Sequence, residues 1–163
     1  MIDIQRVKDR WVVGCEQWFA KPVDTVWPFF ADAFNLEEIT PPYLQFEILT
    51  PGPIEMGVNT IIDYRLRLHG VPIKWKTEIT AWEPPHRFVD EQIKGPYKLW
   101  RHEHRFIEQD GGTLVIDRVA YQLPGGPLAA VANAMIVQRD VHGIFAFRQD
   151  RLAERFGREK PAA

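Results

Sequence analysis

His102 and His104 are the residues of this chain whose types and spacing point most directly to chemistry. They stand two positions apart in the stretch Trp-Arg-His-Glu-His-Arg-Phe, which begins at Trp100. Because successive side chains of a β-strand point to opposite faces, both histidines share a face with Trp100 and Phe106. Arginines and a glutamate occupy the other face. We therefore predict that both imidazoles face the interior, where an imidazole can move a proton, hold a ligand or bind a metal ion.

An Asp-Gly pair at residues 110–111 sets the strand pairing around the histidines. This dipeptide is a strong signal for a two-residue hairpin turn. The resulting register places His104 directly opposite Asp117. It places His102 opposite Val119. Directly opposed residues have Cβ atoms about 4.5–5.5 Å apart, so we expect contact between His104 and Asp117.

The preceding turn, between Ile93 and Tyr97, brings a second group of residues to the same face. It places Phe88, Asp90 and Gln92 beside the histidines. A buried carboxylate next to a neutral imidazole is costly unless the two form a hydrogen bond. The sequence therefore predicts a convergent polar cluster made of Asp90, Gln92, His102, His104 and Asp117.

Three roles for this cluster remain open. An aspartate could hold one imidazole tautomer and poise it for acid–base catalysis, which makes His102, His104, Asp90 and Asp117 the catalytic candidates. The same groups could orient a ligand or a water molecule in a pocket. They could also form a satisfied polar network that only ties adjacent strands together.

Metal binding is the least supported use of the histidine pair. His102, His104 and Glu108 resemble the first metal-binding motif of cupins, and two such histidines can share an ion. The second cupin motif, which would bring another histidine, is absent from the sequence. A long terminal helix does not suit that barrel either. We therefore predict no metal site, and the lack of Gly-rich nucleotide-binding motifs predicts no other cofactor.

Nucleophilic catalysis by serine or cysteine is not expected. The chain contains no serine and one cysteine, Cys15, which lies in a predicted strand. One cysteine cannot form an internal disulfide or a Cys-based zinc site. A lone cysteine in a strand is typical of a small buried hydrophobic residue.

Length, charge and composition narrow the class of protein. The 163 residues suit a single domain with a core at about 11–156, and 45% of them are hydrophobic. The net charge is −2 and no Lys/Arg stripe is present, so no nucleic-acid partner is expected. No apolar run approaches the roughly 18 residues of a membrane span, and the N-terminus is polar. We expect a cytoplasmic protein that is a monomer or a weak homodimer.

Hydrophobic periodicity predicts a sheet between helical regions. The expected elements are a strand at 11–21, two short helices at 22–31 and 32–39, and six antiparallel strands between 43 and 123. The chain from residue 128 has helical periodicity, with a break expected near 139–143 because Gly143 interrupts the run. The apolar stripe of this helix contains Leu128, Val131, Met135, His142, Phe145, Leu152 and Phe156.

An antiparallel sheet with one apolar face needs a cover, and the final helix supplies it. A long, strongly curved sheet wrapped on one helix leaves room for a cavity. Large aromatic side chains with a few convergent polar groups are typical of a small-molecule site. Besides the polar cluster, the expected ligand-contacting residues are Tyr64, Leu66, Trp75, Phe88, Trp100, Tyr121, Met135 and Phe145.

Two segments resemble a known family. Residues 87–106 contain the patterns F-x-D-x-Q, G-P-Y and W-x-H-x-H-x-F, and residues 111–128 contain D-x-V-x-Y. Together with the element order, they resemble the START/Bet v 1 (SRPBCC) superfamily and its bacterial polyketide cyclase/dehydrase-like subgroup. The resemblance implies an α+β helix-grip fold over residues 11–156. In this fold a curved antiparallel sheet, here of about seven strands, wraps on a long C-terminal helix.

The resemblance leaves the chemistry open, because this scaffold carries many activities. The first hypothesis is binding of a small hydrophobic ligand: a polyketide, an isoprenoid quinone, a sterol-like molecule or a lipid. The second is a polyketide cyclase, aromatase or dehydratase in which His102 or His104, steered by Asp117 or Asp90, moves a proton alpha to a carbonyl. The third is an interaction module similar to co-chaperone relatives of the fold.

Overall fold

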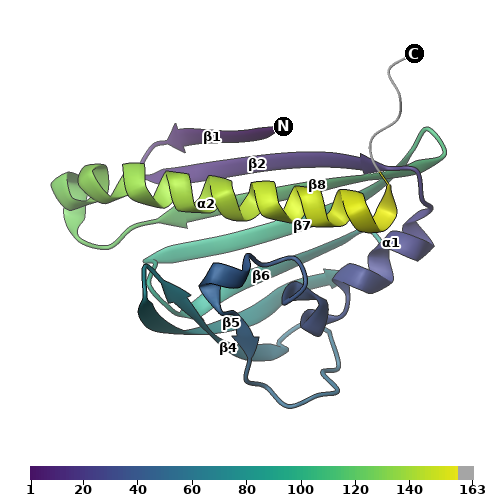
Figure 1. Ribbon diagram of the computed structural model, residues 1–163, viewed down its shortest axis with the longest axis horizontal. Coiled ribbons are helices and arrows are strands. Elements are labelled where there is room, and N and C mark those ends of the chain that lie inside the picture. The colour runs from purple at the N-terminus through teal and green to yellow at the C-terminus, as the bar shows by residue number, and fades with distance from the viewer. Residues whose placement is uncertain (158–163) are drawn as a thin grey trace.

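The computed structural model describes residues 1–157 and shows one curved antiparallel sheet wrapped on a long helix (Figure 1). The arrangement predicted from the sequence is thereby confirmed. The helices are α1 (Val23–Phe30), α2 (Gly126–Phe156) and the short 3-10 helices η1 (Ala33–Leu36) and η2 (Pro42–Leu44). The strands are β1 (Ile2–Val7), β2 (Arg10–Phe19), β3 (Glu47–Ile48), β4 (Ile61–Leu68), β5 (Val71–Glu83), β6 (Arg87–Lys94), β7 (Leu99–Gln109) and β8 (Gly112–Gln122).

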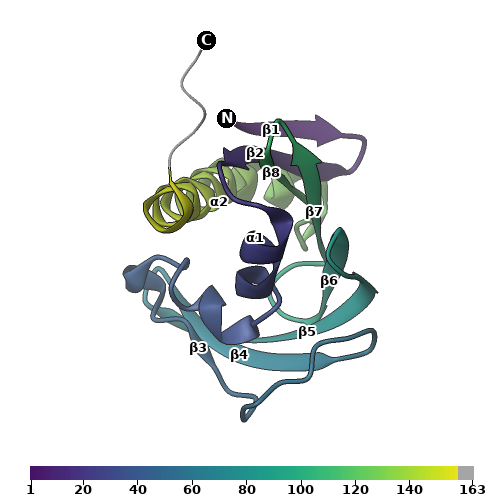
Figure 2. The same ribbon diagram turned by 90° about the vertical axis from the view of Figure 1, so that its right-hand side faces the viewer.

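The strands lie in the order β1-β2-β8-β7-β6-β5-β4-β3, and every neighbouring pair is antiparallel. The first two strands therefore pair with the last one, while the helices that follow β2 carry the chain to the opposite edge. Figure 2 shows the sheet curving like a letter C, with α2 on its open side and α1 across one end. Two register shifts in the pairing of β5 with β6, between Lys76 and Thr77 and between Ile79 and Ala81, accompany this bend.

The start of the chain forms a strand that the sequence analysis missed. Strand β1 lies at a sheet edge, and only Ile2 and Ile4 are partly buried in it. Ile2 and Ile4 alternate with Asp3 and Gln5, but this short alternation is the only strand signal in a charged N-terminal segment, so it did not mark a strand. Other expected elements are shorter than predicted. The second helix is the four-residue η1, and the first strand after it is the two-residue β3. With the missed β1, the sheet has eight strands instead of about seven.

Helix α2 is continuous through Gly143, so the expected break near 139–143 is wrong. A helical glycine costs only about 1 kcal/mol relative to alanine. The buried neighbours Val141 and Phe145 pack this part of the helix against the sheet. In Figure 1 the beginning of α2 extends past the ends of the strands. No helix within residues 1–157 combines the length and apolar character needed to span a membrane.

Helix α1 closes one end of the curved sheet through Trp27. Its ring meets those of Phe88 and Phe106 edge to face, with centroids 5.8 and 5.1 Å apart. Phe106 and Phe88 come from adjacent strands of the central hairpins, β7 and β6. This aromatic contact forms one boundary of the region in which the predicted polar cluster lies.

Candidate functional site: an apolar cavity with a buried His/Asp cluster

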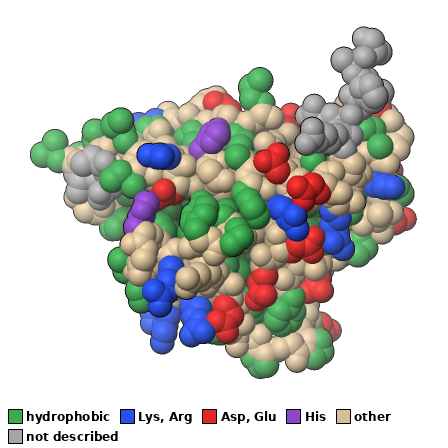
Figure 3. Space-filling model, viewed as in Figure 1, with side chains coloured by type: hydrophobic (Ala, Val, Ile, Leu, Met, Phe, Trp, Pro, Cys, Tyr) green, Lys and Arg blue, Asp and Glu red, His purple; other side chains and the backbone are tan. Residues whose placement is uncertain are grey.

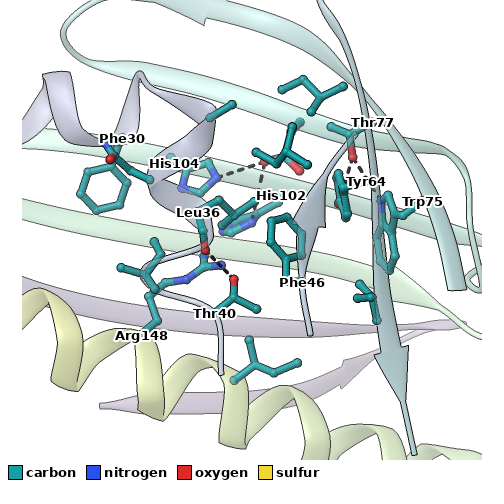
Figure 4. Close-up of a pocket in the computed structure, with 18 of the residues that line it drawn as sticks. Phe30, Leu36, Thr40, Phe46, Tyr64, Trp75, Thr77, His102, His104 and Arg148 are labelled. Carbon is teal, nitrogen blue, oxygen red and sulfur yellow. Dashed lines mark hydrogen bonds and ion pairs between the residues drawn. The ribbon is translucent and has the colours of Figure 1, made fainter. Parts of the chain in front are cut away.

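A cavity of about 180 Å³ lies between the inner face of the sheet, the short helices and α2. Figure 4 shows side chains from all three regions pointing into it, and in Figure 3 apolar side chains gather on the face below α2. Residues 29–79 contribute most of its apolar lining, which includes Phe30, Leu36, Phe46, Ile62, Tyr64, Leu66 and Trp75. The charged and imidazole side chains of the lining come mostly from residues 88–148, namely Asp90, His102, His104, Asp140 and Arg148, with Asp32 from the first stretch.

The strand register around the histidines is the one predicted from the Asp-Gly turn at residues 110–111. Strands β7 and β8 pair His104 with Asp117. They also pair His102 with Val119. Strand β6 adds Asp90 opposite His102. Three neighbouring strands thus bring two imidazoles and two carboxylates to one inner face.

Each carboxylate of the cluster lies near both imidazoles. Asp117 Oδ1 is 3.1 Å from His102 Nε2 and 2.6 Å from His104 Nδ1. Asp90 Oδ2 is 3.1 Å from His104 Nε2 and 3.8 Å from His102 Nδ1. The His104 Nδ1 contact is close but lacks hydrogen-bond geometry. The two ring centroids are 3.7 Å apart, so the four side chains form one compact unit.

Burial and mutual charge move the pKa values of this cluster in different directions. Burial and the charge of His104 lower the pKa of His102. For His104, burial acts against the proton, but the charge and close contact of Asp117 and the hydrogen bond to Asp90 outweigh it and raise the pKa. Burial opposes ionisation of both aspartates, yet interactions with the imidazoles lower the pKa of Asp90 and of Asp117. The cluster therefore favours two carboxylates, a protonated His104 and a neutral His102.

Aromatic rings hold the imidazoles in place. Phe88 stacks on His104 with centroids 4.1 Å apart and planes 17° apart. Phe145 of α2 meets His102 edge to face at 5.7 Å. Across the cavity Tyr64 and Trp75 stack at 5.8 Å, and Thr77 receives a hydrogen bond from Trp75 Nε1. The imidazoles consequently have little freedom to rotate out of the cluster.

Most of the predicted pocket residues reach the cavity, but four do not line it. Asp117 lies behind the imidazoles and is 4% exposed. Gln92 exchanges two hydrogen bonds with the backbone of Tyr97 and secures the β6–β7 turn. Tyr121 is fully buried in a separate core cluster. Met135 is 78% exposed on α2. The residues that do line it are Tyr64, Leu66, Trp75, Phe88, Asp90, Trp100, His102, His104 and Phe145.

Contrary to the sequence prediction, Met135 does not line the cavity, because the beginning of α2 extends past the ends of the strands. Leu128 and Val131, which belong to the same predicted stripe, are also exposed. The periodicity of the stripe is correct for Phe145 and Leu152, which are buried. It fails at the beginning of α2 because the helix there extends beyond the strands (Figure 1).

Arg148 is a cavity residue that the sequence analysis missed. It lies on α2, lines the cavity and is only 8% exposed. A signal for it exists, because the buried residues Val141, Phe145 and Leu152 place position 148 within the same helical stripe. An arginine at a position of this kind is unusual and marks a buried cation.

A metal ion could bind at the cluster only by replacing existing contacts. Asp90, His102 and His104 offer donor atoms that lie within 4.8 Å of one another. The same atoms already face each other as carboxylate and imidazole. Two imidazoles and one carboxylate are a donor set that transition metals accept. The residue types therefore permit an ion, although ligand binding at the cluster does not require one.

The comparisons with known proteins agree with the fold. Residues 19–147 match the family described as polyketide cyclase / dehydrase and lipid transport. A search of curated proteins gives no match. Among solved structures, the nucleoside-diphosphate sugar epimerase from Corynebacterium glutamicum is 26% identical with a TM-score of 0.66. That similarity covers 86% of this chain and 28% of the epimerase, so the chain corresponds to a part of that protein.

Two further solved structures share the fold. The Zhui aromatase/cyclase from Streptomyces sp. R1128 is 18% identical with a TM-score of 0.64, over 88% of this chain and 94% of that one. Ara h 8.0201 is 17% identical with a TM-score of 0.60, over 88% of this chain and 99% of that one. The predicted helix-grip fold is confirmed, and the family supports a role in binding a hydrophobic ligand or in cyclase chemistry. The chain belongs to the polyketide cyclase / dehydrase and lipid transport family.

Proposed function

We propose that this protein binds a hydrophobic small molecule with at least one oxygen function in the cavity between sheet and α2. The observation that carries the proposal is the buried His/Asp cluster in the wall of a largely apolar cavity. Apolar lining supplies affinity through desolvation. Asp90, His102 and His104 supply hydrogen bonds that orient the ligand. Suitable ligand classes are polyketides, isoprenoid quinones, sterol-like molecules and lipids.

The shape of the cavity favours a ligand with a planar ring. One water molecule needs about 10–15 Å³ of such space, so a cavity of about 180 Å³ has room for a much larger guest. Tyr64 and Trp75 lie nearly parallel, with planes 17° apart, and both line the cavity. A rigid aromatic wall packs well against another flat ring. This supports a polyketide or quinone over a flexible acyl chain.

A neutral fluorescent aromatic ketone, Prodan, tests the proposal. We expect saturable binding with a blue shift of its emission, because the probe leaves water for an apolar site. Leu66→Trp, which fills the cavity, should weaken binding at least tenfold. Ile93→Trp adds the same side chain at a position that is 51% exposed on β6 and should leave binding unchanged.

The outcome that contradicts this function is equally clear. Either no saturable binding by the wild-type protein or equal binding by Leu66→Trp would exclude ligand binding in this cavity. Circular dichroism checks that each variant is folded. If Leu66→Trp does not fold, Ala33→Leu on η1 fills the same cavity with a smaller side chain.

A second candidate function is proton transfer by the cluster, as in a cyclase or dehydratase. The favouring observation is that His102 and His104 share one site while their pKa values move in opposite directions. Pairs of like groups whose pKa values are separated by their surroundings are typical of acid–base sites. The fold shared with the Zhui aromatase/cyclase is compatible with such chemistry.

Deuterium exchange tests proton transfer without knowledge of the natural substrate. In D2O the protein should accelerate exchange of the methyl protons of 2-acetylnaphthalene, followed by proton NMR. His104→Gln and His102→Gln should abolish the acceleration, while His142→Gln, at an exposed position of α2, should not. An exchange rate equal to that of buffer, or equal in all three variants, would eliminate this mechanism.

A further inference from the structure

Arg148 is a buried cation without a counter-charge in contact with it. Its side chain comes from α2 and points into the cavity (Figure 4). It is 8% exposed, and its Nε has no hydrogen-bond partner. Within residues 1–157 no carboxylate forms an ion pair with it. Its charge makes a cation–π contact with the ring of Phe145, at 5.1 Å, and is attracted to Asp90 without forming an ion pair with it.

The other buried charged groups of the described chain all have partners. Glu103 is contacted by Arg87, Arg101 and Arg105. Asp117 is contacted by both imidazoles of the cluster. The chain thus pairs its buried charges wherever they serve the fold. Arg148 departs from this pattern, and it does so at the surface of a cavity.

A guanidinium cannot escape the cost of burial by losing its proton. An unpaired buried charge is strongly unfavourable, so a partner that enters the cavity would recover that cost. Asp90 attracts Arg148 at a distance but forms no ion pair with it, and its Oδ2 already faces His104 at 3.1 Å. Asp32, which also lines the cavity, accepts the backbone N–H of Phe34. Asp140, another carboxylate that lines the cavity, is paired with His69 at 2.7 Å.

We propose that Arg148 binds a carboxylate of the ligand, whose ring system lies against Tyr64 and Trp75. This inference rests on the ligand-binding function proposed above and adds the charge of the ligand to it. The planar fork of a guanidinium matches the two oxygens of a carboxylate. A phosphate carries nearly two charges at neutral pH. One cation would balance only part of that charge, and Asp90 in the same cavity repels a doubly charged phosphate more strongly than a singly charged carboxylate.

The binding preference follows from this pairing. A ligand with one carboxylate and an aromatic ring should bind better than the same ring with a neutral oxygen. His102 lies near Arg148, because the ring of Phe145 contacts both side chains. A carboxylate held by Arg148 would therefore fix the distance between the rest of the ligand and the His/Asp cluster. Arg148 is thus the anchor that positions the ligand beside the cluster.

Three probes with the same ring test the proposal by isothermal titration calorimetry: 2-naphthoate, 2-naphthalenemethanol and 2-naphthyl phosphate. We expect the wild-type protein to bind the carboxylate at least tenfold more tightly than the alcohol, and more tightly than the phosphate. Arg148→Met should remove the preference for the carboxylate, and Arg148→Lys should keep part of it. Arg151→Met, three residues further along α2, removes a surface arginine paired with Glu154 and should change nothing.

The stability of the ligand-free protein gives a second measurement. Because Arg148→Met removes an unpaired buried charge, it should raise the unfolding temperature by about 3 °C. A purely structural role of Arg148 predicts a decrease in both Arg148→Met and Arg148→Lys. That result would overturn the proposal even if no probe were tested.

The binding outcomes separate this proposal from the ligand-binding function. If the alcohol binds in the cavity but the carboxylate gains nothing, the role of Arg148 is wrong and ligand binding stands. If the phosphate binds most tightly and depends on Arg148, the ligand class is wrong. If neither the three probes nor Prodan binds, both proposals fail together.

Discussion

Asp117 Oδ1 lies 3.1 Å from His102 Nε2 and 2.6 Å from His104 Nδ1, so one buried oxygen serves both imidazoles. The carboxylate belongs to β8 and both histidines belong to β7, and the pairing of these strands places Asp117 directly opposite His104. Asp117 does not itself line the cavity. It acts from behind the histidines and determines their charge and orientation.

Asp117→Asn should destabilise the protein by about 3 kcal/mol, because removal of one partner from a buried ionic group leaves the others uncompensated. Urea unfolding followed by tryptophan fluorescence measures the loss. Asp63→Asn is the matched control, since Asp63 pairs with Lys76 on the surface. It should cost less than about 1 kcal/mol. Equal losses in the two variants would show that the cluster contributes no more than a surface ion pair.

The two cluster histidines should titrate in opposite directions from the ordinary value of about 6.5. The pKa of His104 is raised, so its ionisation stabilises the fold below about pH 6.5 and this contribution is lost as pH rises through the raised value. The pKa of His102 is lowered, so its contribution is present above about pH 6.5 and is lost as pH falls through the lowered value. NMR titration of the imidazole protons checks both, and two shifts of the same sign would contradict the expectation.

Glu103, on the outer face of β7, should account for part of the loss of folding stability at low pH. Burial opposes its ionisation, but hydrogen bonds from Arg105, Arg101 and Arg87 lower its pKa from 4.5 to about 2. Its contribution is therefore present above about pH 4.5 and is lost as pH falls toward 2.

Glu103→Gln should accordingly lose about 2 kcal/mol at pH 6, after allowance for screening of the partly exposed arginines, and little at pH 2. Unfolding by urea at a series of pH values gives the comparison. A constant difference between wild type and variant at all pH values would show that the ion pairs do not carry the effect.

Gly95 should tolerate a methyl group only when Gln92 is removed. A Cβ at position 95 would clash with Gln92 Oε1, which accepts the backbone N–H of Tyr97. Gly95→Ala should cost about 1–2 kcal/mol through loss of these hydrogen bonds. In a Gln92→Ala background the cost should vanish. A double-mutant cycle measured by chemical unfolding gives the coupling, and additive effects would refute this account of the turn.

Removal of metal ions should not change the stability of the protein. The donor atoms of Asp90, His102 and His104 already face one another within the cluster. We expect dialysis against EDTA to leave the unfolding temperature unaltered, and elemental analysis of untreated protein to find less than one equivalent of any transition metal. A lower unfolding temperature that Zn²⁺ or Fe²⁺ restores would reverse the prediction.

The polar cluster could be predicted from the sequence because short turns fix strand register. The Asp110-Gly111 turn leaves one register for β7 and β8, and alternation then assigns His102, His104 and Asp117 to one face. The same logic failed for Gln92. It belongs to the correct strand, but its hydrogen bonds with Tyr97 turn its side chain to the strand end.

Helix α2 was harder to predict because periodicity gives a face but not the position of the helix along the sheet. Phe145 and Leu152 lie where the stripe places them, while Met135 lies beyond the strands. Arg148 was missed because hydrophobic patterning ignores charged residues. The edge strand β1 was missed because its alternation, Ile2 and Ile4 with Asp3 between them, is short and lies in a charged segment.

The division of the cavity lining between two stretches of chain makes this protein modular. Residues 29–79 shape the apolar space, whereas Asp90, His102, His104 and Arg148 come from the later strands and α2. Substitutions in the first stretch would therefore reshape the space of the cavity without replacing the His/Asp cluster or Arg148.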